Sequence, residues 1–402
     1  MPGFILHAVA LSNMLEKHFL KLSPAWVEVV LMLITIPTCV YLSFFFQQMA
    51  LRVLLPTLIF AGYIVIALYA FMLDIHLPLA GFVTVYPLAF LGSLGYLTFT
   101  EGAERRKYSK VLSNMVDPSI VSEALNDLEA LKKGGEREIT AFFSDVAGFS
   151  TISEQLSSAD LAALLNEYLG AMTIILKQNH GTLDKYIGDA VVGIFGAPIN
   201  REEHFMESAK ASLEMIAKLK ELKKYWSENN LYCKDAQDMD VRIGLNTGLA
   251  KVGFMGTEAL ASYTMMGDTV NLAARLEAAG KDYGVNILIS EFTNEKIKER
   301  FFTRKLDVVR VKGKNEPVQL FELIAIKGSE PVNLKKAAGI YEDAFSFYLK
   351  QHWDRAIELF QEAETARGSK DKAVEMLIDR CLYYKNSPPG ESWDGVFTRK
   401  HK

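Results

Sequence analysis

Charge is almost absent from one long stretch of this sequence. Residues 22–100 contain only three charged side chains, Glu28, Arg52 and Asp74, although the 402-residue chain has 44 basic and 48 acidic residues. The stretch divides into apolar runs at 26–46, 53–73 and 77–99, and about 20 apolar residues are enough to cross a bilayer. We therefore expect three transmembrane helices within residues 25–100 and a water-soluble body after them. This pattern excludes both a wholly cytosolic enzyme and a fully embedded transporter.

The residues after the third run predict the orientation of the chain. Arg105, Arg106, Lys107 and Lys110 follow it closely, and basic residues beside a membrane helix favour the cytoplasmic side. We expect a multi-pass protein of the plasma (inner) membrane, with its N-terminus outside and its soluble body in the cytoplasm.

Overall charge and cysteine content exclude two further classes. The net charge is −4 with no long basic run, so binding to nucleic acid has no electrostatic support. Cys39, Cys233 and Cys381 lie far apart, which indicates neither a disulfide framework nor a cysteine-type zinc site.

A helical connection is predicted between membrane and body, over residues 101–135. Its apolar residues recur at helical spacing, and Asp117-Pro118 marks a break with a new helix start. A plain spacer and a dimerising stalk that carries a signal both fit this pattern.

Two aspartates follow apolar runs in a way that suggests phosphate and metal chemistry. Residues 139–143 predict a strand that ends at Asp145, and the turn 146–150 leads into a helix predicted from 153 to 179. Backbone amides at such a turn suit phosphate oxygens. Gly188-Asp189 predicts a hairpin turn between two further strands. On adjacent strands the two carboxylates would converge and could hold Mg²⁺, although a simple turn or cap residue is the alternative for either aspartate.

Three further segments complete the pattern. Residues 241–248 and 251–256 predict a second hairpin. Asp268 or Thr269 is expected to cap a helix that carries Asn271 and Arg275 on one face, where Arg275 could also simply pair with an acidic neighbour. A last hairpin is predicted over 304–323.

Five motifs, in this order, resemble those of the class III adenylate and guanylate cyclases: FSDVAGF, DKYIGDAVVGIFG, VRIGLNTG, YTMMGDTVNLAARLE and VKGK. The resemblance covers residues 136–326. It implies an α+β catalytic domain with a ferredoxin-like βαββαβ core and helices on one face. The implied reaction converts ATP or GTP to a 3′,5′-cyclic monophosphate and pyrophosphate.

The resemblance also implies a role for individual residues. Asp145 and Asp189, with the carbonyl of Val146, would hold two divalent cations, Mg²⁺ or Mn²⁺. One cation would lower the pKa of the ribose 3′-hydroxyl, and the other would neutralise the triphosphate. Asn271 would orient the ribose, and Arg275 would stabilise the transition state. The residues expected to contact the substrate phosphates and line the site are Gly148, Phe149, Ser150, Gly188, Arg242 and Lys312, with Lys314 as a weaker substitute for Lys312.

Lys185 and Thr264 match the two positions that read the purine in this family. A lysine at the first position favours adenine, since guanine-reading members carry an acidic residue there. Many adenine-reading members have aspartate at the second position, and Thr264 departs from that pattern. One chain carries all parts of a site that the family builds between two domains, so a symmetric homodimer is implied. We expect an adenylate cyclase; a guanylate cyclase and a non-catalytic nucleotide-binding scaffold are the alternatives.

The two ends of the chain carry separate signals. Residues 1–24 resemble the last part of an extracellular sensor domain of the CHASE2 type. Residues 327–387 predict paired helices similar to one tetratricopeptide (TPR) unit, either a packing and dimer-support element or a peptide-binding module. Residues 388–402 are expected to be mobile.

Overall fold

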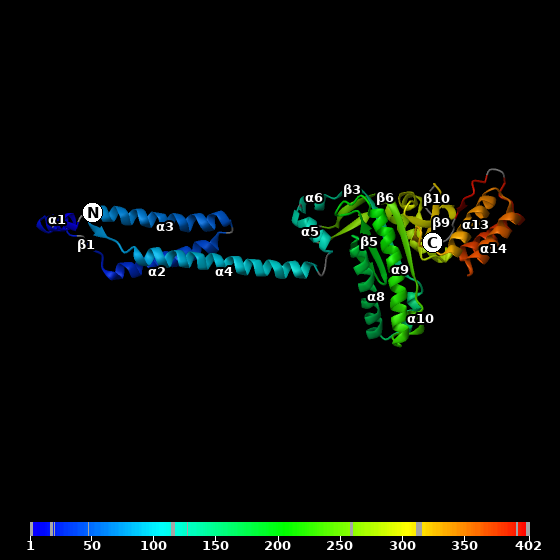
Figure 1. Ribbon diagram of the computed structural model, residues 1–402, viewed down its shortest axis with the longest axis horizontal. Coiled ribbons are helices and arrows are strands. Elements are labelled where there is room, and N and C mark those ends of the chain that lie inside the picture. The colour runs from blue at the N-terminus through cyan, green and yellow to red at the C-terminus, as the bar shows by residue number, and fades with distance from the viewer. Residues whose placement is uncertain are drawn as a thin grey trace. The chain divides into compact units, whose positions relative to one another are not determined.

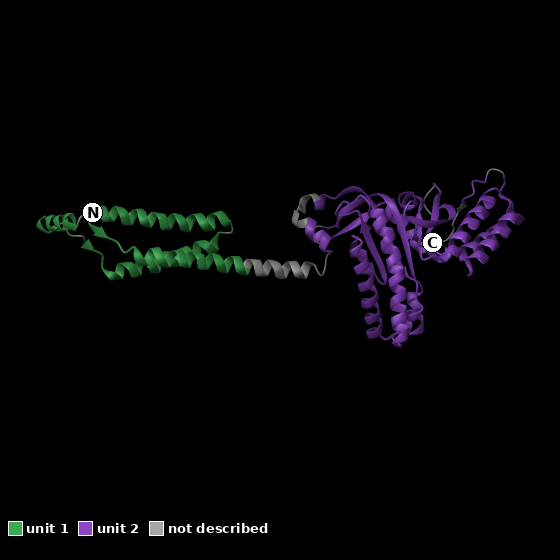
Figure 2. Cartoon of the chain, viewed as in Figure 1, with its two compact units in different colours: residues 1–114 green, residues 115–402 purple. Residues whose placement is uncertain are grey.

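The computed structural model describes residues 3–16, 19, 21–46, 48–113, 117–126, 128–257, 260–310, 316–390 and 393–398. For residues 101–113, 124–126, 128–130 and 397–398 it describes the backbone alone. The chain divides into two compact units, residues 1–114 and 115–402 (Figure 2).

The first unit is helical and contains α1 Gly3–Leu15, α2 Ala25–Phe45, α3 Met49–Met72 and α4 Ala80–Ser113 (Figure 1). Two short strands, β1 Lys21–Leu22 and β2 Ile75–His76, pair in parallel. Cys39, Tyr63, Phe82 and Tyr86 form the core between the helices. Helix α4 continues from the third apolar run into the expected connection, so the boundary expected at residue 100 is not a break in the helix.

Four helices in the described part of the chain are long and apolar enough to span a bilayer. Three coincide with the predicted runs: α2, α3 and Ala80–Thr100 of α4. The fourth, α8 Ser158–Gln178, was not predicted as a candidate, and it buries Leu164, Tyr168 and Met172 in the core of the second unit. The apolar helices fit a membrane-anchored protein, while the count of three spans stays a prediction.

The second unit is built on a nine-stranded mixed sheet. The strands are β3 Gly135–Val146, β4 Thr182–Ile187, β5 Ala190–Phe195, β6 Val241–Gly256, β7 Ala261–Met266, β8 Ile287–Ser290, β9 Phe301–Arg310, β10 Val318–Ile326 and β11 Phe397–Thr398. The helices are α5 Pro118–Asn126, α6 Leu128–Lys133, α7 Phe149–Gln155, α8, α9 His204–Glu228, α10 Lys234–Gln237, α11 Asp268–Tyr283, α12 Glu291–Ile297, α13 Val332–Leu349, α14 Trp353–Arg367 and α15 Lys372–Asn386.

The centre of this sheet has the predicted order of elements. Strands β3, β4, β5 and β6, with α8 and α9 between them, follow each other as β-α-β-β-α-β. In space the order is β6-β3-β5-β4, and every neighbouring pair is antiparallel. Strand β8 then joins β6 in parallel, which makes the whole sheet mixed.

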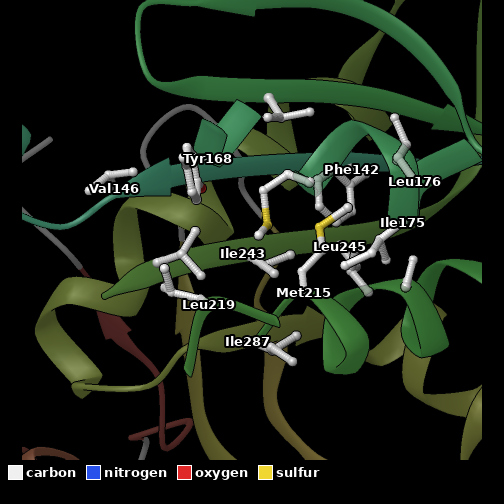
Figure 3. Packing of buried hydrophobic residues seen from close by; sticks show 14 of the residues in the cluster. Phe142, Val146, Tyr168, Ile175, Leu176, Met215, Leu219, Ile243, Leu245 and Ile287 are labelled. Atoms are coloured by element: carbon white, nitrogen blue, oxygen red, sulfur yellow. The ribbon is translucent and has the colours of Figure 1, made fainter. Parts of the chain in front are cut away.

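Helices cover both faces of the sheet, which corrects the expectation of helices on one face. Successive side chains of a strand point to opposite faces. Phe142 packs with α8 and α9 in one cluster, which Figure 3 shows, whereas Ile139 and Ala141 pack on the other face with β7 and α11. Helix α11 lies so close to β6 that a Cβ on Gly244 would come within 2.3 Å of the carbonyl oxygen of Ala273.

Two local predictions about the middle of the domain were wrong. Residues 241–256 form one continuous strand rather than a hairpin, because β3 pairs with β6 along its length, including Ile139 opposite Gly248. The turn lies after β6 instead, and the next strand, β7, pairs with β6 in antiparallel orientation. Gly267, not Asp268 or Thr269, is the N-cap of α11, while the Thr269 hydroxyl donates to the carbonyl of Leu249.

The C-terminal tail forms three helices, α13 to α15, where two were predicted. Their apolar side chains share one core with α11, β8, β9 and β10. Buried ion pairs cross this contact, including Arg380–Asp307 at 2.6 Å and Arg304 with Asp371. Trp393 packs on Tyr348, and β11 pairs with β9. Both lie in the segment that was expected to be mobile. The tail is therefore part of the second unit.

Candidate functional site

The two predicted metal-binding aspartates lie together at one end of the central strands. Asp145 is the penultimate residue of β3, and Asp189 occupies the turn between β4 and β5. The backbone N–H of Val146 donates to Asp189 Oδ2 over 3.0 Å. Burial, and then the negative charge of Asp145, raises the pKa of the Asp189 carboxyl. Two carboxylates that repel each other in this way gain from a shared cation.

Among the described residues, three backbone amides of the turn after β3 have no hydrogen-bond acceptor. Gly148 has φ +74°, a left-handed conformation that glycine adopts without strain, and it is the N-cap of α7. The Val146 amide is used by Asp189, and the Ala147 amide donates to the Asp240 carbonyl over 2.8 Å. The amides of Gly148, Phe149 and Ser150 come at the start of the helix, where no intrahelical acceptor exists. Of residues 146–150, which were expected to bind phosphate, only these three have backbone amides that remain available among the described residues.

Arg242 reaches the acidic pair from β6. It lies opposite Asp145 in the strand register. Its Nη2 donates to Asp145 Oδ2 over 2.6 Å, and its Nε donates to Glu277 Oε1 over 3.0 Å. The Arg242 guanidinium was expected to bind phosphate. In the structure it lies beside the acidic pair and donates hydrogen bonds to two carboxylates. Glu277 was not predicted as part of the site; burial raises the pKa of its carboxyl.

The two predicted purine-reading residues also meet. Lys185 Nζ on β4 donates to the hydroxyl of Thr264 on β7 over 3.3 Å. The Thr264 hydroxyl in turn donates to Asp184 Oδ2 over 2.7 Å. Asp184 is a second residue that was not predicted to belong to the site. Its position directly before Lys185 was the available signal, but alternation along a strand would direct neighbouring side chains to opposite faces.

Asn271 and Arg275 lie on the exposed side of α11, one helical turn apart. Within the described residues, neither side chain forms a hydrogen bond or ion pair with the acidic pair. Glu277 pairs with Arg242, and among the described residues no pairing of Arg275 with Glu277 is seen. Lys312 and Lys314 lie outside the described residues.

The donor set around the acidic pair fits divalent cations that are completed by a substrate. Asp145 and Asp189 provide hard carboxylate oxygens, the ligand type that Mg²⁺ and Mn²⁺ prefer. No group of three or more histidine, cysteine, aspartate or glutamate side chains converges in the described ranges. Magnesium is often held by one or two carboxylates together with substrate phosphates, and the amides at 148–150 lie next to Asp145 in the chain.

Comparison with known proteins identifies the part of the chain that bears this site. Residues 131–324 match the family described as adenylate and guanylate cyclase catalytic domain. A terminal-differentiation specific adenylate cyclase of Dictyostelium discoideum is 32% identical over 250 residues, which are 61% of this chain and 11% of that protein. Retinal guanylyl cyclase 2 of Rattus norvegicus is 30% identical over 197 residues, 47% of this chain and 16% of that protein.

A solved structure is also similar to about half of the chain. The adenylyl cyclase CyaB from P. aeruginosa is 32% identical, with a TM-score of 0.44, over 49% of this chain and 98% of that one. The chain spans well under two thirds of the two curated relatives named above.

Proposed function

We propose that the chain is a membrane-anchored adenylate cyclase, because residues 131–324 match the adenylate and guanylate cyclase catalytic domain. It would convert ATP to 3′,5′-cyclic AMP and pyrophosphate, with the domain in the cytoplasm and the apolar helices in the plasma (inner) membrane. The proposal rests on one observation. Asp145 and Asp189 lie close together, beside Arg242 and the backbone amides of residues 148–150.

In this reaction the ribose 3′-oxygen forms a bond to the α-phosphorus, and the bond from that phosphorus to the bridging oxygen of the β-phosphate breaks. Pyrophosphate leaves, and the proton of the 3′-hydroxyl passes to water or to the released pyrophosphate. Asp145, Asp189 and the Val146 carbonyl would hold two divalent cations, which acidify the 3′-hydroxyl and neutralise the triphosphate. The amides of Gly148, Phe149 and Ser150 would donate to the β- and γ-phosphates.

The remaining groups of the site would come from a second copy of the chain. Asn271 and Arg275 are exposed and make no bond to the acidic pair of their own protomer in the described residues. A two-fold dimer would bring them from the partner subunit to the substrate held by Asp145 and Asp189. There Asn271 would orient the ribose, and Arg275 would stabilise the charge that develops on the α-phosphate.

Adenine is the proposed base because Lys185 and Thr264 meet side by side. A lysine donor suits the ring nitrogen N1 of adenine, and a hydroxyl oxygen suits its exocyclic amine. A guanylate cyclase with the same chemistry is the second candidate, since a guanylyl cyclase is among the relatives of 30% identity. A scaffold without turnover has less support, because Asp145, Asp189, Asn271 and Arg275 are all present.

The test is the identity of the product. The full chain, purified in detergent or nanodiscs, is incubated with Mn²⁺ and either ATP or GTP, and cyclic nucleotides are measured by mass spectrometry. A preparation of the Asp145→Asn variant, made in the same way, controls for contaminating cyclases. We expect cyclic AMP in excess; an excess of cyclic GMP would replace adenine by guanine, and no cyclic product would reject a cyclase altogether.

A further inference from the structure

We propose that Asp184 determines the base specificity of this site, because it holds the hydroxyl of Thr264 in an orientation that can only accept a hydrogen bond from the purine. The inference rests on the proposed function, in which Lys185 and Thr264 read the base. It assigns a task to a carboxylate that is neither a metal ligand nor a phosphate contact.

A β-bulge brings Asp184 to this position. Leu183 pairs with Gly193 and Lys185 pairs with Val192, so Asp184 is the extra residue between two consecutive pairs. A bulge interrupts the alternation of side chains and can redirect one of them. Asp184 and Lys185 are therefore both within reach of Thr264, although they are neighbours in the strand.

The hydrogen bond from Thr264 makes Asp184 Oδ2 an acceptor in this contact. Its side chain is 2% exposed, and its Oδ1 has no hydrogen-bond partner among the described residues. Lys185 Nζ lies 3.5 Å from that oxygen and favours the charged carboxylate. Burial raises the pKa of the Asp184 carboxyl, but the hydrogen bond from Thr264 and the charge of Lys185 oppose this rise. An ionised carboxylate has no hydrogen to donate.

The direction of the Thr264 hydroxyl follows from counting hydrogens. A threonine hydroxyl has one hydrogen and two lone pairs. The hydrogen is committed to Asp184 Oδ2 over 2.7 Å, and one lone pair accepts from Lys185 Nζ over 3.3 Å. What remains for a ligand is a second lone pair, which can accept but cannot donate.

This remaining lone pair distinguishes the two purines. The exocyclic amine of adenine is a donor, so it can bond to the Thr264 oxygen. The 6-oxo group of guanine is an acceptor and would face another acceptor without a hydrogen between them. A site that leaves buried polar groups unpaired with the wrong ligand discriminates against that ligand strongly. Without Asp184, the hydroxyl could rotate and donate to guanine.

The test is a double-mutant cycle in the full chain. Asp184→Ala and Thr264→Val are made singly and together, and kcat/KM is measured for ATP and for GTP. Asp184→Leu is made alongside as a second variant that also lacks an acceptor but fills more of the space. We expect each single variant to lower the preference for ATP over GTP by roughly tenfold or more. The double variant should lower it no further, because both changes remove the same hydrogen bond between Thr264 and Asp184.

Binding gives a second readout that does not require turnover. Dissociation constants of non-reactive ATP and GTP analogues are measured for the same proteins, with Thr264→Ser as a control that keeps the hydroxyl and therefore the preference. An unchanged preference in both Asp184 variants, while Thr264→Val loses it, would overturn the inference. A wild-type chain that yields no cyclic product but prefers the ATP analogue, and loses that preference with Asp184→Ala, would reject the cyclase while supporting the role of Asp184.

Discussion

At the scale of single residues, the acidic pair decides what the site can do. Asp145 is 33% exposed at its side chain and already shares a hydrogen bond with Arg242, which neutralises part of its charge. Asp189 accepts from the Val146 amide, and burial and Asp145 both raise the pKa of its carboxyl. The protein thus brings two like charges together without a full set of counter-charges of its own, and a divalent cation would supply the rest.

The first prediction removes the charge of Asp189. Asp189→Asn keeps an oxygen that can accept from Val146, so the turn should stay folded. With one metal ligand weakened, turnover should fall by about two orders of magnitude or more. The measurement is cyclic AMP formation at saturating ATP over a range of Mn²⁺ concentrations. Asp354→Asn, a carboxylate that is 74% exposed in the tail, is the matched control; a rate near wild type for Asp189→Asn would contradict the metal assignment.

The second prediction concerns pH and His204. This side chain is 5% exposed, its Nδ1 lies 2.9 Å from the Thr140 hydroxyl, and Glu138 lies 3.8 Å from its Nε2. Burial lowers the pKa of His204 below its ordinary 6.5; Glu138 opposes this shift and Lys296 adds to it. Between that lowered pKa and 6.5, only the unfolded chain binds the proton, so stability falls as the pH falls through this window.

His204→Gln removes the group that titrates. The thermal midpoint of the wild type should therefore fall more steeply than that of the variant as the pH drops below 6.5. Thermal unfolding in a series of buffers measures this, with the exposed His7→Gln as the control. Parallel pH profiles for the wild type and His204→Gln would show that another group causes the acid sensitivity.

The residue types of the site could be predicted from the sequence, but several of their contacts could not. The hairpin turn at Gly188-Asp189 is confirmed, because its dipeptide and flanking apolar runs are local signals. The involvement of Asp184 depends on a bulge in β4, and that of Glu277 on the packing of α11 against β6. Both are set by tertiary pairing, which leaves no mark in the spacing of residues along the chain.

Among the helices and strands, too, the features that could not be predicted are those set by tertiary pairing. Strand and helix types in the domain were largely predictable, yet β6 was expected to break near residues 248–251. Gly248 is a typical turn residue, but pairing with β3 keeps it in an extended strand. The tail was correctly expected to be helical. The sequence gives its helices apolar faces, but it did not identify the sheet as the partner on which these faces pack.

The third prediction tests how the tail is held. Arg380 of α15 and Asp307 of β9 form an ion pair at 2.6 Å with side chains 8% and 0% exposed, and the Tyr283 hydroxyl of α11 donates to the same carboxylate. Arg380→Met leaves Asp307 buried without its cation, which should cost about 3–5 kcal/mol of unfolding free energy. Denaturant unfolding of the second unit, followed by tryptophan fluorescence, measures the loss.

An exposed ion pair in the same tail provides the control. Arg355 and Glu358 are 55% and 64% exposed at their side chains, so Arg355→Ala should cost about 0–1 kcal/mol. Equal effects of Arg380→Met and Arg355→Ala would mean that the buried pair contributes no more than a surface pair.

For the assembled molecule, we propose that the site is shared between two protomers. In the described residues Asp145 and Asp189 meet each other and Arg242, whereas Asn271 and Arg275 are exposed on α11 without a bond to them. A symmetric dimer would join each acidic pair to the α11 of the other copy and produce two equivalent sites. Catalysis would then require assembly, and defects in different halves of the site could compensate each other.

The last prediction follows from this division. Arg275→Ala alone should lower turnover by about two to three orders of magnitude with a modest change in ATP affinity, and Asp145→Ala alone should abolish it. In a mixture of the two variants, each mixed dimer has one site in which both residues are intact, so part of the activity should return. Co-expression with two different affinity tags allows the mixed dimer to be purified in two steps, and its cyclic AMP production is compared with that of each variant. The Asp145→Ala, Arg275→Ala double variant, mixed with wild type, controls for dilution. Because such a mixed dimer lacks any intact site, it should stay inactive. A confirmed mixed dimer of the single variants with no regained activity would mean that each protomer carries its own complete site.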